Sequence, residues 1–278
     1  MRNSARTSAT SATRCGGLVA RLTEIFAHRK SPDTNVSGMA TRASDDWNVL
    51  EHGTISKLTE RLWRVEGMLP GMSLRRVMTV AKRASGGLLI HSAIALNESE
   101  MAELEAWGKP ELLLIPSGYH RLDAPAYKKR YPALRVFAPR GSRGKVEEVI
   151  RVDGTYDDVP RDDVVQAFTL PGTDEREGGM LVRGGDGITL ILNDVVMNMD
   201  RRKDLLGFLF TTLLGSAPGP RVSRLSKLAI VKDRRALKAE LLRLAALPDL
   251  ARLVVSHDKV TSGRSEARAA LEQAATYL

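Results

Sequence analysis

Short apolar runs separated by turn residues recur along the chain and predict β-strands. Residues 76–81 and 87–94 are two such runs, and residues 83–86 between them are typical of a hairpin turn. Residues 180–182 and 188–192 are expected to pair in the same way, because the segment that joins them is rich in glycine. Further strands are predicted at residues 112–115, 134–138, 164–170 and 253–255, and residues 58–65 are expected to be a first strand or a short amphipathic piece.

Helical patterns occur between these strands. Asn97 with Glu100 three residues later is typical of the start of a helix, which should run through Trp107 and end at Gly108. From residue 204 to 214 the apolar content is almost continuous, which predicts a helix that is buried or lies against a partner. Other helices are expected at 124–130, at 265–277 and around Leu237, Leu241 and Leu244.

Polar side chains follow three of the predicted apolar strands. His120 comes after residues 112–115, Asp194 after 188–192 and His257 after 253–255. An ionised Asp at the end of a buried strand needs a partner, and strand ends are where α/β proteins place their chemistry. If these ends lie together, two imidazoles and one carboxylate could bind one divalent metal ion.

Simpler structural roles compete with this interpretation of the strand ends. Asp194 could cap a helix that begins near Asp200. His91, inside a predicted strand, is better explained as a hydrogen-bonded core histidine than as a ligand.

The loop at residues 117–123 combines several functional groups in one glycine-containing segment. Tyr119, His120, Arg121 and Asp123 could all point into one crevice from this position. Structural alternatives exist for two of them, because Asp123 could cap the helix at 124–130 and Arg121 could simply be solvated.

Composition restricts the class of protein. The chain has 278 residues, 43% hydrophobic and 27% charged, as is ordinary for a soluble globular protein. No segment has the roughly 18 consecutive apolar residues that a membrane-spanning helix needs. The single cysteine, Cys15, excludes an intramolecular disulfide and a cysteine-based zinc site and indicates a reducing, cytoplasmic environment.

The net charge of +9 is concentrated at the beginning of the chain. Residues 1–44 contain seven Arg or Lys and only two acidic residues, together with many Ser, Thr and Ala. We expect them to be a disordered extension, or one present only because the true start is Met39, and we expect one domain at residues 45–278. A transit peptide or a functional arm are the alternatives.

A second basic stretch runs from Arg221 to Lys238 and contains seven Arg or Lys with only Asp233 to offset them. Such a stretch could contact the phosphates of a nucleic acid. A solvated surface is the favoured interpretation, because no aromatic residue is interleaved with the charges to stack on bases.

Four segments stand out as possible family motifs: residues 87–92, Gly118-Tyr119-His120-Arg121, residues 190–199 and Val254-Val255-Ser256-His257. With the order of the predicted elements, they resemble the metallo-β-lactamase superfamily over roughly residues 55–278, and more closely an uncharacterised bacterial and plant family within it. The resemblance implies a four-layer αββα sandwich, an α/β (α+β) fold with its metal site at one rim of two sheets.

Matched to the superfamily, Asp194 stands where a carboxylate bridges two metals and His257 where the last histidine ligand stands. Residues 117–123 occupy the place of a His-x-His-x-Asp-His motif, of which only His120 and, with a shift, Asp123 could supply ligands. Thr173 replaces the histidine of a Pro-Gly-His segment, and residues 89–92 stand where a strand usually ends in Asp. These departures argue against an ordinary dinuclear zinc site.

The sequence therefore predicts a divergent hydrolase with one zinc, iron or manganese ion held by His120, Asp194 and His257, in which Asp123 or Tyr119 assists proton transfer. The alternative is a metal-free binding or scaffold protein in which the same residues form a hydrogen-bonded core network. Nucleic-acid processing is a third and less favoured hypothesis. The substrate and the oligomeric state do not follow from the sequence, although the apolar 205–214 segment could pack against a second subunit.

Overall fold

The computed structural model describes residues 43–70 and 72–278. Of the predicted N-terminal extension at residues 1–44, only residues 43 and 44 are described. The predictions for the rest of it, including the alternative start at Met39, lie outside the described residues. The domain predicted to begin at residue 45 falls almost entirely within the described part.

The first sheet has seven strands in the order in which they occur along the chain. They are β1 (Ser56–Thr59), β2 (Leu62–Leu69), β3 (Met72–Lys82), β4 (Leu88–His91), β5 (Pro110–Leu114), β6 (Arg135–Ala138) and β7 (Gly154–Thr155). The first four pair antiparallel and the last three continue the sheet in parallel. The predicted β3–β4 hairpin is confirmed, whereas residues 58–65 contain a turn between two strands and not one strand.

The second sheet has five strands in the order β12-β11-β10-β9-β8. These are β8 (Val165–Thr169), β9 (Gly178–Gly184), β10 (Gly187–Leu192), β11 (Leu250–Val255) and β12 (Val260–Ser262). The predicted β9–β10 hairpin is confirmed, and β10 pairs with β11 in parallel. Because parallel strands end on the same side of a sheet, the residues after β10 and β11 meet at one rim.

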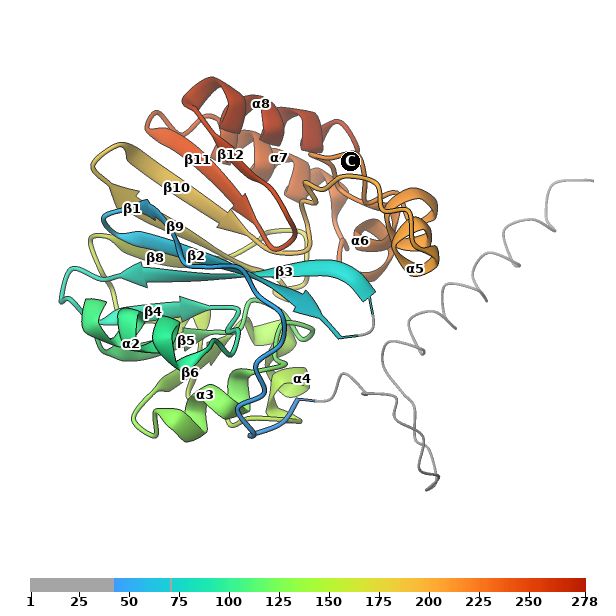
Figure 1. Cartoon of the computed structure of the whole chain (residues 1–278). Coiled ribbons are helices and arrows are strands. Elements are labelled where there is room, and N and C mark those ends of the chain that lie inside the picture. Colours follow the sequence, from blue (N-terminus) through green and yellow to red (C-terminus); the bar gives the residue numbers. More distant parts are fainter. Residues whose placement is uncertain (1–42, 71) are drawn as a thin grey trace, which may run out of the picture. The chain divides into compact units, whose positions relative to one another are not determined.

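Three apolar clusters divide the domain into four layers (Figure 1). One cluster packs the first sheet against α2 (Glu98–Trp107), α3 (Ala124–Arg130) and α4 (Arg143–Glu147). Another packs the second sheet against α6 (Arg224–Ala229), α7 (Arg234–Ala245) and α8 (Arg264–Ala275). The third lies between the sheets, so the predicted αββα sandwich is confirmed. Short 3-10 turns η1 (Arg140–Ser142) and η2 (Tyr156–Asp158) complete the helices of the first half.

The apolar residues of β4 show that both faces of the first sheet are covered. In β4, Leu88 and Ile90 belong to the cluster under the helices, and Leu89 belongs to the cluster between the sheets. All three are at most 1% exposed. A strand buried on both faces shows a continuous apolar run, which is the pattern found in the sequence.

The apolar segment at residues 204–214 differs from its prediction. It forms one helical turn, α5 (Leu205–Phe208), that continues as a π-helical stretch, η3 (Leu209–Leu213). Only part of this segment is buried, because Gly207 and Thr211 face inward while Leu205, Phe208 and Leu213 are exposed. Of the two predicted alternatives, burial is therefore only partial, and packing against a partner stays a prediction.

Candidate metal centre

Three strand ends bring His120, Asp194 and His257 together. His120 lies in the loop after β5 of the first sheet, and Asp194 and His257 each lie two residues beyond the paired ends of β10 and β11. The last register pair of these strands joins Leu192 to Val255, so Asp194 and His257 follow it at equal distance. The grouping predicted from the strand ends is therefore present in the structure.

The carboxylate of Asp194 joins the two imidazoles. Its Oδ1 lies 3.0 Å from His120 Nε2 and 3.2 Å from His257 Nε2. One potential ligand atom from each residue lies within 4.8 Å of the others, and the three side chains are only 6–13% exposed. The capping alternative for Asp194 is wrong, because no helix begins near Asp200 and the next one, α5, begins at Leu205.

The backbone of β3 fixes the ring of His257. Its Nδ1 lies 2.5 Å from the carbonyl oxygen of Arg75. Because a carbonyl can only accept, Nδ1 must carry a hydrogen, and in the neutral ring the lone pair is then on Nε2. That lone pair points to Asp194, and two acceptors facing each other require either a proton or a cation between them.

A serine holds the ring of His120. Ser92 Oγ lies 2.9 Å from His120 Nδ1, and Ser92 has the positive φ of 58° that non-glycine residues seldom adopt. A hydroxyl can donate or accept, so either tautomer of His120 finds a partner there. Nε2 of His120 can therefore donate to Asp194 or present a lone pair to a cation.

The pKa values of Asp194 and His257 are shifted by the contacts within this cluster. Burial acts to raise the pKa of Asp194, but the charge and hydrogen bond of His120, and then those of His257, hold that pKa well below its ordinary value. Burial acts to lower the pKa of His257, but its hydrogen bond to the Asp194 carboxylate and that group's charge raise the pKa above the ordinary value. Without a cation, the centre is therefore an ion pair between an aspartate and an imidazolium.

A buried polar chain supports the second-sheet half of the centre, and the sequence interpretation missed it. Ser256 Oγ donates to Asn193 Oδ1, and Asn193 Nδ2 donates to Glu177 Oε2 at 3.1 Å. These three side chains are at most 4% exposed, and Ser226 Oγ donates to the backbone oxygen of Asp194 at 2.7 Å. Asn193 beside Asp194 was the one available sequence signal, whereas Glu177 lies in a loop with no motif.

Burial, and then the charge of Asp194, raise the pKa of Glu177 well above its ordinary value, although the hydrogen bond from Asn193 acts in the opposite direction. Glu177 therefore holds a proton at neutral pH and does not add a second negative charge beside Asp194.

The two residues predicted to assist proton transfer occupy different environments. Tyr119 is 60% exposed in the loop that carries His120. Asp123 is buried, and its Oδ2 lies 2.6 Å from Arg76 Nη2 and accepts from Ala95 N at 3.0 Å. Asp123 stands at the N-cap position of α3 but makes no side-chain cap there, so its side chain links β3 to the segment before α2.

Other positions singled out in the sequence have structural partners. Thr173 is buried and donates to the carbonyl of Leu170 at 2.7 Å. Arg121 pairs with Glu148 at 2.8 Å. Arg221 in the basic stretch lies 4.5 Å from the ring centre of Tyr277.

His91 lies in the core between strands, as its position in an apolar run predicts. It is 2% exposed, and burial and then the charge of His120 lower its pKa from 6.5 to about 3. Its Nε2 has no hydrogen-bond partner among the described residues. His91 is therefore neutral, but the expectation that both its nitrogens are hydrogen-bonded is wrong.

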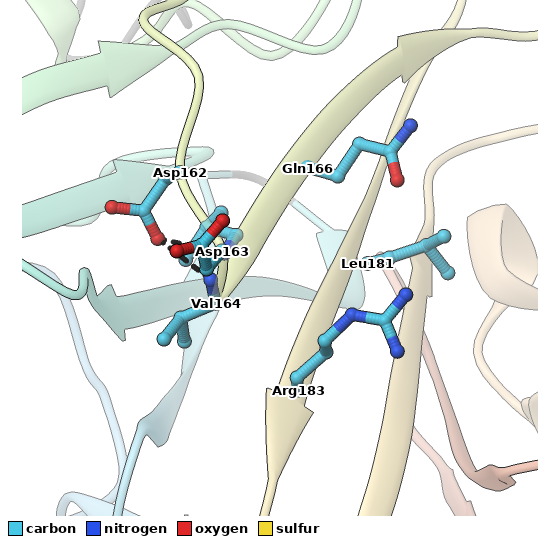
Figure 2. A pocket seen from close by; sticks show the side chains of 7 residues that line it. Asp162, Asp163, Val164, Gln166, Leu181 and Arg183 are labelled. Carbon is cyan, nitrogen blue, oxygen red and sulfur yellow. Dashed lines mark hydrogen bonds between the residues drawn. The ribbon is translucent and has the colours of Figure 1, made fainter.

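A polar hollow of about 220 Å³ lies on the outer edge of the second sheet, away from the centre (Figure 2). Figure 2 shows Gln166 of β8 and Leu181 and Arg183 of β9 around it. Because β8 and β10 both run antiparallel to β9, the hollow at the start of β8 is on the rim opposite to Asp194. Asp162 at its margin is already bound to the backbone nitrogens of residues 164 and 165.

Solved metallo-β-lactamases share this fold. FIM-1 from Pseudomonas aeruginosa, solved in its mono-zinc form, aligns over 84% of this chain and 98% of its own with 12% identity and a TM-score of 0.53. A metallo-β-lactamase from Pontibacter korlensis aligns over 81% and 99% with 11% identity and a TM-score of 0.55. DIM-1, exposed to ceftazidime, aligns over 82% and 98% with 12% identity and a TM-score of 0.56.

No family model and no curated protein matches the sequence. The likeness therefore establishes the metallo-β-lactamase fold, and the chemistry has to be argued from the residues of this chain. Within the described residues, no helix has the length and apolar character needed to cross a membrane.

Proposed function

We propose that this chain is a mononuclear metal-dependent hydrolase of the metallo-β-lactamase fold, with His120, Asp194 and His257 as the metal ligands. The observation that carries the proposal is the convergence of two imidazole Nε2 atoms on one carboxylate oxygen, at 3.0 and 3.2 Å. Three such ligands, with a further position left open, are the donor set of catalytic zinc sites.

The hydrogen bonds behind the ligands support this assignment. Metal-binding histidines usually donate their second ring nitrogen to a carbonyl, carboxylate or hydroxyl group, which fixes the ring and its tautomer. His257 meets this requirement through the Arg75 carbonyl and His120 through the Ser92 hydroxyl. A zinc, iron or manganese ion held there would act as a Lewis acid toward a carbonyl or phosphoryl oxygen and toward water.

The chain's own residues would then have separate roles. Asp194 places its charge between the histidines, and the chain of Ser256, Asn193 and Glu177 holds the ends of β10 and β11 at a fixed spacing. We propose Tyr119 for proton transfer, because it is exposed in the loop that carries His120. A catalytic role for Asp123 stays a prediction, and its ion pair with Arg76 supports a positioning role more directly.

One observation favours a second candidate function. The hydrogen bonds of Asp194 to both histidines already satisfy the cluster without a cation, provided that His257 carries a proton. A metal-free binding or scaffold protein would retain such a network for stability alone. Replacement of the Pro-Gly-His ligand by Thr173, which is bonded to Leu170, agrees with this alternative.

Elemental analysis by mass spectrometry separates the two functions. Full-length protein without an affinity tag, purified without chelators, is compared with the triple variant His120→Ala, Asp194→Ala, His257→Ala and with His52→Ala as a control. His52 is a suitable control because it lies outside the centre and contacts Asn97. Near-stoichiometric metal in the parent and in His52→Ala, lost in the triple variant, supports the hydrolase.

If neither the parent nor the triple variant contains metal after supplementation with zinc, iron and manganese, the hydrolase proposal fails. The metal-free alternative then predicts a lowered melting temperature for His257→Ala, and an unchanged melting temperature would count against that alternative as well.

A further inference from the structure

Residues 205–213 expose three large apolar side chains within two helical turns. Leu205 is 83% exposed, Phe208 51% and Leu213 53%. Monomeric soluble proteins seldom leave such side chains clustered at the surface, and clusters of this kind usually mark a contact with a partner or a membrane. We call this segment, which comprises α5 and η3, the apolar rim. Figure 1 shows α5, in orange, at one edge of the fold beside the beginning of β3.

Packing on its inner side fixes the position of the apolar rim. Phe210 packs against a small cluster that contains Leu74, Met197 and Met199. Thr211 is fully buried, donates to the carbonyl of Gly207 at 2.6 Å and accepts from the backbone nitrogen of residue 202 at 3.1 Å. The exposed side chains are therefore held outward by a packed inner face.

Positive charges flank the apolar rim on both sides. Arg201 and Lys203 precede it and are exposed, and Arg224 follows it, with its backbone nitrogen bonded to the carbonyl of Leu214 at 3.0 Å. Asp204, directly before the apolar rim, accepts from the backbone nitrogen of Gly207 at 2.9 Å. The neighbouring Asp200 pairs with Lys259 at 2.6 Å.

We propose that the apolar rim docks on an anionic lipid surface. Exposed Leu and Phe side chains flanked by Arg and Lys are the combination that binds the boundary between lipid headgroups and acyl chains. The apolar groups enter the acyl region, and the cations remain at the level of the phosphates. The net charge of +9 on the whole chain adds a long-range attraction to such a surface.

Charge argues against a second copy of the chain as the occupant. A symmetric dimer places the same patch on both subunits, so the interface would contain twice the excess of Arg201, Lys203 and Arg224 over Asp204. Bringing this excess of positive charge together costs free energy. An anionic surface neutralises it.

The location of the apolar rim gives the proposal a consequence for the centre. The ring centroids of Phe210 and His257 are 6.4 Å apart, and Arg202 pairs with Asp258, the residue after His257, at 2.5 Å. A membrane that receives the apolar rim would therefore lie beside the candidate metal centre.

Flotation of full-length protein with vesicles tests the proposal. The vesicles are phosphatidylcholine alone or phosphatidylcholine with phosphatidylglycerol, at low and at raised salt. We expect the parent to bind the anionic vesicles. The affinity of the double variant Leu205→Ser, Phe208→Ser should be lower by at least about tenfold, because two apolar anchors are lost. The affinity of the double variant Arg201→Gln, Lys203→Gln should be roughly tenfold lower. Leu242→Ser is the matched control, because Leu242 is also exposed, at 43%, but lies on α7.

Two results would overturn the proposal. One is binding of the anionic vesicles by the Leu205→Ser, Phe208→Ser variant as strong as that of the parent, which would assign binding to charges elsewhere, including residues 1–44. The other is an absence of vesicle binding together with a dimer, seen by analytical ultracentrifugation, that the same variant dissociates. Neither measurement depends on bound metal, so the proposal can fail or hold independently of the proposed hydrolase.

Discussion

The two sheets contribute to the candidate centre in different ways. The second sheet supplies Asp194 and His257 from adjacent parallel strands, and buried hydrogen bonds from Ser256 through Asn193 to Glu177 join those strand ends. The first sheet supplies one of the three side chains, His120, from a loop, and the Arg75 carbonyl that orients His257. Among the described residues, Ser92 is the one side chain besides Asp194 that is hydrogen-bonded to His120. One half is thus built into the core, and the other half is attached to it through few contacts.

We infer from this difference that the free energy of unfolding and the orientation of the potential metal ligands depend on different residues. Groups in the second-sheet half are buried and linked, so their removal should lower the free energy of unfolding. Groups in the first-sheet half should instead affect how well His120 is oriented. Four substitutions or conditions test this division, from the largest expected effect to the smallest.

The largest effect is expected from Asp194→Ala, which removes the group that both halves share. In metal-free protein it leaves the buried His257 without its counter-charge, and we expect the free energy of unfolding to fall by about 3 kcal/mol, as for other broken buried ion pairs. Urea unfolding in the presence of a chelator measures this. Asp200→Ala is the control, because its ion pair is on the surface and should contribute less than about 1 kcal/mol. Equal stability of the two variants would contradict the view that Asp194 connects the halves.

Glu177→Ala tests the second-sheet half alone. It leaves Asn193 with an unpaired buried amide, so we expect a loss of about 2 kcal/mol in the free energy of unfolding. Glu177→Gln should cost clearly less, because the native carboxyl is protonated and Gln keeps its shape without adding charge. Guanidinium unfolding of both variants provides the comparison. If Gln is as damaging as Ala, Glu177 acts as a charged group and its assigned proton is wrong.

The pH dependence of stability separates buried His91 of the first sheet from buried His257 of the second. The pKa of His91 is lowered to about 3, so the unfolded chain takes up a proton near pH 6.5 while the native protein does not. The contribution of His91 to the free energy of unfolding is therefore fully present above pH 6.5 and declines as the pH falls toward 3. At pH 5 the decline amounts to about 2 kcal/mol. The pKa of His257 is raised, so its contribution is present at low pH and is lost as the pH rises through the raised value.

Urea unfolding of parent and His91→Gln between pH 7 and pH 5 isolates the first of these contributions. The variant should lose less stability than the parent over this interval, by about 2 kcal/mol. Parallel curves for the two proteins would show that His91 is not kept neutral by the core.

The smallest effect is expected from Ser92→Ala in the first-sheet half. It removes the partner of His120 Nδ1, and we expect metal affinity to fall about tenfold with little change in stability of the metal-free protein. Competition with a chromophoric chelator measures the affinity. Ser256→Ala is the matched variant in the other half and should lower stability more than Ser92→Ala does. The reverse order would mean that the two halves are supported equally.

The apolar runs of the sequence predict most of the strands, and the resemblance to the metallo-β-lactamase superfamily implies the sandwich. The convergence of His120, Asp194 and His257 is predicted only on the condition that their strand ends lie together. Apolar runs such as residues 188–192 mark strands covered on both faces, and the polar residues that follow them lie at the strand ends whichever neighbours those strands have. The sequence could not predict that β10 and β11 are adjacent, since pairing between residues about 60 positions apart leaves no local pattern. Their adjacency is what brings Asp194 to His257.

The burial of Glu177 could not be predicted from the sequence, for a physical reason. Glu177 lies in a loop whose acidic composition predicts solvent exposure, yet the fold buries it because Asn193 provides a partner. The 204–214 segment, which is helical as predicted, shows the opposite case. Its apolar pattern predicts burial, but only one face finds a partner within the described residues.

The separation of the centre's parts along the chain has a consequence for biosynthesis. His120 and Asp194 are 74 residues apart, Asp194 and His257 are 63 apart, and the carbonyl that orients His257 is 182 residues before it. A nascent chain therefore cannot bring these groups together until both sheets, up to His257 after β11, have been synthesised and have packed against each other. A metal at the proposed centre would enter only after that step, so its binding would report that the fold is in place.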